Sequence, residues 1–131
     1  MVFGVFDGMH KGHRWFLGEA AKHGDELIAV AARDEIVRLL KKRNPMQSQA
    51  KRLQALKGIS EVSRVVLGDV QMGSYAVLKK YQPDVICLGY DQDALAEDLE
   101  KRMKNNEIPR SRLVRIRAHE AHRWHSSLLT Q

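Results

Sequence analysis

Two histidines, His10 and His13, lie three positions apart within the segment GVFDGMHKGH at residues 4–13. A short apolar run precedes this segment and a helical pattern follows it, so the histidines fall where a strand passes into a helix. Such a helix directs its unpaired N–H groups at this place, which makes an anion site, and Gly4 and Gly8 let the backbone approach a ligand closely. Two imidazole donors here could bind a triphosphate and stabilise charge while its α-phosphorus is attacked.

The sequence excludes two common phosphate-binding motifs at this junction. It has neither the Gly-x-Gly-x-x-Gly pattern of dinucleotide-binding folds nor the Gly-Lys-Ser/Thr of the P-loop. The structural alternative is a pair of surface histidines at a helix start, after a plain turn at Asp7-Gly8. The apolar strand before the pair and the helix after it favour a functional site over that alternative.

Short apolar runs alternate with helical periods along the chain. Strands are expected at residues 2–6, 26–32, 62–67, 85–88 and 113–116. Helices are expected at residues 11–23, 34–42, 47–56, 74–81 and 93–104, with Ser74 as an N-cap and a further short helix from Ser126. The alternation indicates an α/β fold: a Rossmann-like doubly wound parallel sheet of about five strands, in a single domain over residues 1–131. Such sheets bind ligands at the carboxyl ends of the strands, where the strand order reverses.

The composition narrows the classes of partner. The chain has a formal net charge of +6 and a pI near 9.7, but its basic residues are dispersed, which suits a triphosphate site better than a dedicated nucleic-acid arm. The single cysteine, Cys87, has apolar neighbours and is interpreted as a buried core thiol. No apolar run approaches the roughly 18 to 20 residues of a membrane span. Because Met1 leads straight into an apolar segment without a basic leader, a cytoplasmic location is expected.

Residues 4–13 resemble the Gly-Thr-Phe-Asp-x-x-His-x-Gly-His signature of the cytidylyltransferase-like nucleotidyltransferases, with Val5 in place of the usual Thr. Other matches follow in the family's order and span essentially the whole chain: Ala32-Arg33-Asp34, residues 41–45, Arg52, residues 88–92 and His125-Ser126-Ser127. The resemblance implies that a nucleoside monophosphate moves from a nucleoside triphosphate to a phosphorylated acceptor, with release of pyrophosphate. It also implies Mg²⁺ bound with the triphosphate, which needs few protein ligands, and no permanent metal site is expected.

Within the family, the segments at residues 32–34, 41–45 and 88–92 look most like archaeal-type FAD synthases, which transfer AMP from ATP to FMN and give FAD. The alternative is a cytidylyltransferase that uses CTP and glycerol 3-phosphate or another phosphorylated alcohol or sugar. Two alternatives come from other classes: a non-catalytic nucleotide-binding module, suggested by Val5, and a basic RNA-binding domain. Relatives are often dimers, so the resemblance also implies a homodimer.

The resemblance assigns roles to individual residues. The expected catalytic residues are His10, His13 and Lys41. Nucleotide binding is expected of Phe6, Gly8, His10, His13, Gly89, Asp91, Ser126 and Ser127. Acceptor binding is expected of Asp7, Lys41 and Arg43, the last two from the loop after the second strand.

Several of these residues have a plainer alternative. Asp7 could brace the first loop, Lys41 could belong to a solvated basic face, and Asp91 could be the N-cap of the following helix. Trp15 and Phe16 are expected in the core rather than as a base-stacking platform, and Trp124 is an alternative platform for a base or flavin.

Overall fold

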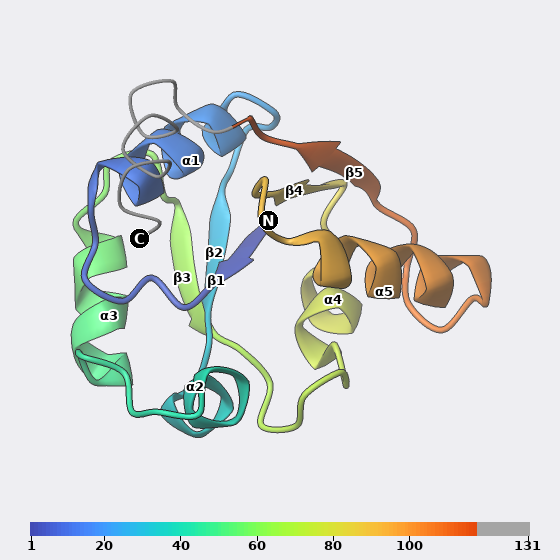
Figure 1. Ribbon diagram of the computed structural model, residues 1–131. Coiled ribbons are helices and arrows are strands. Elements are labelled where there is room, and N and C mark those ends of the chain that lie inside the picture. The colour runs from blue at the N-terminus through green and yellow to red at the C-terminus, as the bar shows by residue number, and fades with distance from the viewer. Residues whose placement is uncertain (118–131) are drawn as a thin grey trace.

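The computed structural model describes residues 1–117 of the chain (Figure 1). Its strands are β1 (Val2–Gly4), β2 (Ile28–Ala31), β3 (Arg64–Leu67), β4 (Val85–Leu88) and β5 (Arg112–Arg115). Its helices are α1 (Lys11–Ala21), α2 (Asp34–Lys41), α3 (Gln49–Lys57), α4 (Ala76–Tyr81) and α5 (Asp93–Lys104). Among these residues, no helix has the length and hydrophobicity needed to cross a bilayer.

The strands form a three-stranded parallel sheet in the order β3-β2-β1 and a two-stranded one of β4 and β5, and contacts between β1 and β4 give the overall order β3-β2-β1-β4-β5. Parallel ladders join β1 to β2, β2 to β3, and β4 to β5. The two halves meet where the Cys87 N–H donates to the Met1 carbonyl at 3.0 Å. The order therefore reverses between β1 and β4, which confirms the predicted doubly wound parallel sheet of about five strands and makes the carboxyl ends of these two strands the expected ligand site.

Alternate residues of the strands pack on opposite faces of the sheet, which explains why the strands are apolar throughout. One core cluster joins Val2, Ala29 and Cys87 to α1 and α3. The other joins Val30 and Ile86 to α4 and α5. Figure 1 shows these two pairs of helices on either side of the sheet. Cys87 is buried, as predicted, and burial raises the pKa of its thiol.

Two predictions about local structure are wrong. Ser74 is not the N-cap of α4, because Tyr75 takes that position at φ 51° and the carboxylate of Asp69 accepts from the first N–H groups of the helix. Trp15 is not in the core: it is 36% exposed, and its indole donates to the Arg117 carbonyl at 3.1 Å. The buried face of α1 is formed by Leu17 and Ala20 instead, and Phe16 is half-buried beside it.

Candidate active site

The loop after β1 begins with a buried aromatic residue in a left-handed backbone conformation. Phe6 has φ 55° and is 3% exposed, which ends the first strand earlier than the sequence predicts. A Cβ on Gly4 would lie 2.9 Å from two atoms of the Phe6 ring, so only glycine fits beneath it. The ring centroid lies 5.8 Å from that of His13. The side chain of Phe6, expected to bind nucleotide, is therefore part of the core and packs against the ring of His13 from the core side.

Asp7 and Gly8 attach this loop to the segment before α3. The Asp7 carboxylate accepts from the backbone N–H groups of Met46 and Gln47, at 2.7 and 2.8 Å. The Gly8 N–H donates to Gln47 Oε1 at 3.2 Å, and Gly8 has φ +64°, a conformation that favours glycine. Both carboxylate oxygens of Asp7 are engaged within the protein, so its geometry matches the bracing role rather than acceptor binding.

His10 and His13 cap the first turn of α1. His10 is the N-cap residue, and its Nδ1 accepts from the Gly12 N–H at 3.0 Å. The His10 N–H in turn donates to His13 Nδ1 at 3.3 Å. The two ring centroids are 4.0 Å apart. The structure thus brings the two predicted catalytic histidines side by side at a helix N-terminus, where the helix dipole favours an anion.

The capping bonds determine which ring nitrogen carries the proton. A neutral imidazole has one donor and one acceptor nitrogen. Because Nδ1 of both His10 and His13 accepts from a backbone N–H, the proton of each neutral ring is on Nε2. Two Nε2–H donors, held by the helix start itself, are the hydrogen-bonding arrangement that phosphate oxygens require.

A fully buried arginine holds the loops of this region together. The guanidinium of Arg52 donates to the Val5 carbonyl at 2.8 Å, to the Gln47 carbonyl at 3.1 Å and to Asp34 Oδ1 at 2.7 Å. Its side chain is 0% exposed. The sequence marks Arg52 only as a match to the family pattern and does not reveal this role. The available signal was its position four residues before the core residue Leu56, on the same face of α3.

The Asp34–Arg52 pair predicts a specific acid sensitivity. Burial alone would raise the pKa of the Asp34 carboxyl, but the hydrogen bond from Arg52, a backbone hydrogen bond from Gln49 and the charge of Arg52 together outweigh it and hold that pKa below its ordinary value of 3.8. The stability that this carboxylate contributes is therefore present above the ordinary value and is lost as the pH falls through the lower, folded-state pKa. Asp34→Asn removes the titrating group, so its urea midpoint should fall less than that of the wild type between about pH 5 and about pH 2.5. Parallel pH dependences for the two proteins would contradict this assignment.

The end of β4 lies next to the end of β1, at the point where the strand order reverses. The Gly89 N–H donates to Gln92 Oε1 at 2.8 Å, and Gln92 Nε2 donates to the Phe3 carbonyl of β1 at 2.9 Å. Gln92 is the N-cap of α5, so Asp91 is not, and that alternative is excluded. A Cβ on Gly89 would lie 3.2 Å from Asp91 Oδ1, which places this carboxylate against the strand end. Gly89 and Asp91 thus lie at the predicted edge of the sheet, and Gln92, which the sequence marked only as part of the family match at residues 88–92, ties that edge to β1.

Lys41 and Arg43 were both predicted to bind the acceptor from the loop after the second strand, but only Arg43 lies in that loop. Lys41 is the last residue of α2 and not part of a loop, because the helix continues until Lys42 turns at φ 57°. Arg43 follows in the loop, and both Lys41 and Arg43 are exposed. The chain then runs to residues 46–47, which the first loop holds through Asp7. Ser126, Ser127 and Trp124 lie outside the described residues.

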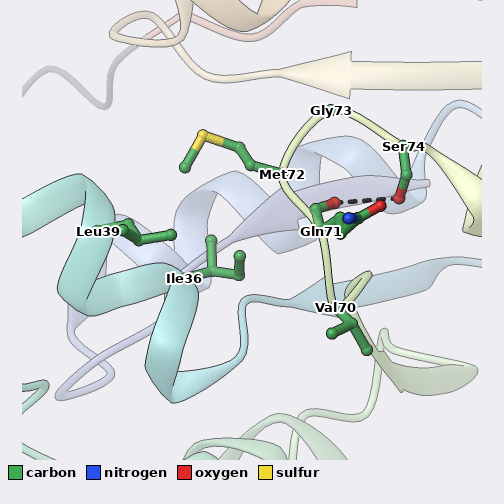
Figure 2. Close-up of a pocket in the computed structure, with 7 residues that line it drawn as sticks. All are labelled: Ile36, Leu39, Val70, Gln71, Met72, Gly73 and Ser74. Carbon is green, nitrogen blue, oxygen red and sulfur yellow. Dashed lines mark hydrogen bonds between the residues drawn. The ribbon is translucent and has the colours of Figure 1, made fainter.

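A groove that no sequence pattern predicted lies beside α2 (Figure 2). It has a volume of about 530 Å³, within the range of small-molecule sites. Figure 2 shows Ile36 and Leu39 of α2 on one side and Met72 with the turn around it on the other. The lining is completed by neighbours of Met72: Val70, Gln71, Gly73 and Ser74. Since these segments follow β2 and β3, the groove lies at the carboxyl ends of these two strands.

Among residues 1–117, no group of three or more His, Cys, Asp or Glu side chains could hold a metal ion.

Comparison with known proteins identifies relatives across most of the chain. A family model described as cytidylyltransferase-like matches residues 1–128. A protein named FAD synthase from Thermococcus sibiricus is 40% identical over 111 residues, which cover 82% of this chain and 75% of the relative. A protein of the same name from Pyrococcus horikoshii is 44% identical over 105 residues, covering 80% and 71%. The crystal structure of a protein described as a lipopolysaccharide core biosynthesis protein from Thermoplasma volcanium is similar with a TM-score of 0.82 and 33% identity, covering 92% and 96%.

Proposed function

Since this chain belongs to the cytidylyltransferase-like family of nucleotidyltransferases, we propose that it transfers AMP from ATP to FMN, releasing pyrophosphate and giving FAD. The observation that carries the proposal is the pair His10 and His13 at the start of α1, whose ring centroids are 4.0 Å apart and whose Nδ1 atoms both accept from backbone N–H groups. Relatives named FAD synthase support the choice of acceptor.

The chemistry requires positioning and charge stabilisation rather than a general base. A phosphate oxygen of FMN attacks the α-phosphorus of ATP, a new P–O bond forms, and the bond to the bridging oxygen of the β-phosphate breaks. The electron pair of that bond leaves with pyrophosphate. Because the FMN phosphate is already an anion near pH 7, no residue has to remove a proton from it. His10 and His13 donate to the phosphate oxygens on which charge develops.

Other residues at this edge of the sheet complete the nucleotide site in our proposal. Gly89 lets the nucleotide approach the end of β4, and the Asp91 carboxylate accepts from ribose hydroxyls or holds Mg²⁺ through water. Mg²⁺ supplies charge neutralisation on the triphosphate when bound. Ser126 and Ser127 stay predicted phosphate contacts.

The groove beside α2 suits the ring system of the acceptor. Its walls are apolar at Ile36, Leu39 and Met72, and they carry one amide side chain at Gln71. An isoalloxazine ring has the same character, with a broad apolar face and a polar edge. Lys41 and Arg43, which follow Leu39 along the chain, would then bind phosphate oxygens. The cytoplasmic location and the homodimer stay predictions.

Replacing Lys41 or Arg43 by alanine should mainly weaken binding of the acceptor or the triphosphate. Each change removes one exposed cation without removing a core contact, so the Michaelis constant of at least one substrate should rise several-fold. Lys57→Ala, a change of an exposed lysine on α3, is the matched control. Unchanged Michaelis constants for both substrates in both variants would exclude this role.

Pyrophosphate release from the purified protein tests the proposed substrates. ATP and CTP should each be combined with FMN and with glycerol 3-phosphate, in the presence of Mg²⁺. We expect release with ATP and FMN. Release only with CTP and glycerol 3-phosphate would keep the reaction and replace both substrates, and nucleotide binding without release in any combination would favour a non-catalytic module.

A further inference from the structure

One wall of the groove is built from side chains that have little core packing of their own. Val70 is 67% exposed and Met72 is 55% exposed. Within the turn, the Ser74 hydroxyl contacts the Gln71 carbonyl at 3.0 Å (dashed line in Figure 2) and Asp69 Oδ2 at 2.6 Å. These local bonds fix the shape of the turn, but its position relative to the rest of the molecule requires a further attachment.

That attachment is a cluster of polar side chains between the turn and α5. The Tyr75 hydroxyl donates to Asp98 Oδ2 at 2.6 Å. Arg102 Nε donates to the same oxygen at 3.0 Å, and the Arg102 guanidinium lies 5.1 Å from the centre of the Tyr75 ring. Arg102 is itself held by Glu107, with an N–O separation of 3.7 Å. We call Tyr75, Asp98 and Arg102 the turn anchor.

The backbone of the wall depends on this anchor. Gly73 has φ +81° and Tyr75 has φ 51°, and left-handed backbone at a tyrosine persists only where the surroundings hold it. A Cβ on Gly73 would lie 3.3 Å from Arg102 Nη2, so the guanidinium lies against the backbone of the turn itself. Arg102 therefore contacts both Gly73 and Tyr75, on the two sides of Ser74.

The charges of the anchor are complementary. The Tyr75 hydrogen bond, and then Arg102, hold the pKa of the Asp98 carboxyl below its ordinary value. Burial and Asp98 raise the pKa of the Tyr75 phenol. At neutral pH the phenol is therefore a donor and the carboxylate an acceptor, and a hydrogen bond to an ionised group of this kind is short and strong.

We propose that the turn anchor positions the groove wall at Gln71 and Met72 and thereby sets how tightly the acceptor binds, without contacting the acceptor or the reacting phosphates. This inference rests on the proposed function, because it takes FMN as the acceptor and the groove as the place of its ring. Tyr75, Asp98 and Arg102 are positioning residues for the reaction.

Tyr75→Phe tests the proposal with the smallest change. It keeps the ring beside Arg102 and removes only the bond to Asp98. We expect the Michaelis constant for FMN to rise at least threefold, while kcat and the Michaelis constant for ATP stay within twofold. FMN fluorescence quenching by the protein should show the same loss of affinity without any turnover. Asp98→Asn, which loses the charge facing Arg102, should likewise raise the Michaelis constant for FMN and lower the affinity for FMN measured by fluorescence quenching.

Tyr81→Phe is the matched control, since Tyr81 is a half-buried tyrosine at the end of the same short helix and also lies near cations, Arg64 and Lys80. Its constants for both substrates should match the wild type. An unchanged constant for FMN in Tyr75→Phe would overturn the proposal, as would an equal rise for ATP and FMN, which is the mark of general loosening. A wild-type protein that does not turn over FMN at all would instead refute the proposed function, before any variant is compared.

Discussion

Replacing His10 or His13 by alanine lowers turnover by at least about tenfold while the fold stays intact, because each change removes one imidazole donor from the site where charge develops. The two ring centroids are 4.0 Å apart, and each ring is oriented by a backbone N–H group. Steady-state rates of pyrophosphate release, measured on variants with wild-type circular dichroism, give the result.

The capping role of His10 requires its own control. His10→Ala also removes the N-cap of α1, at a cost of about 1 kcal/mol in stability. His10→Asn restores a capping side chain but not the imidazole donor, so it should regain stability and stay slow. His23→Ala, an exposed histidine after the same helix, should leave turnover unchanged. Near-wild-type turnover of both His10→Ala and His13→Ala would refute the assigned site.

Arg52→Met should lower the free energy of unfolding by about 3 kcal/mol, the largest stability effect that we expect of any single change here. The substitution leaves the Val5 and Gln47 carbonyls without their donor and leaves Asp34 without its ion pair. Arg52→Lys should recover only part of the loss, because an ammonium group lacks the planar fork that serves three acceptors. Urea unfolding at neutral pH gives the measurement.

Lys51→Met is the matched control for this experiment, since Lys51 is the exposed neighbour of Arg52 on α3. A surface change of this kind should alter stability by less than about 0.5 kcal/mol. If the free energy of unfolding of Arg52→Met lay within about 0.5 kcal/mol of the wild-type value, the buried guanidinium would not be what holds the loops together.

The sheet and the order of its elements could be predicted because they depend on periodic patterns. Apolar strands such as 85–88 pack on both faces, and the strand-to-helix junction at His10 follows from the change of period. Trp15 was misplaced because a large apolar residue on a helix can lie at the edge of the core, where its indole finds a carbonyl partner instead. The pattern gives the face of a helix but not how far the neighbouring layer extends over it.

The attachments within the site could not be predicted in the same way. Asp7 is 39 residues from Met46, and Tyr75 is 23 residues from Asp98. Such pairs carry no periodicity, and a carboxylate in a loop has many partners within reach. The groove has the same origin, since Leu39 and Met72 come together only because α2 and the turn after β3 follow neighbouring strands.

The fate of the α-phosphate of ATP tests the central claim most directly. ATP radiolabelled at the α-phosphate is incubated with FMN, Mg²⁺ and the protein, and a parallel reaction uses ATP labelled at the γ-phosphate. Transfer of AMP to FMN predicts that the α-label moves into FAD and the γ-label into pyrophosphate, and that His10→Ala and His13→Ala slow both equally. An α-label that stays in ATP, or that appears in ADP while the γ-label is released as orthophosphate, would contradict the account.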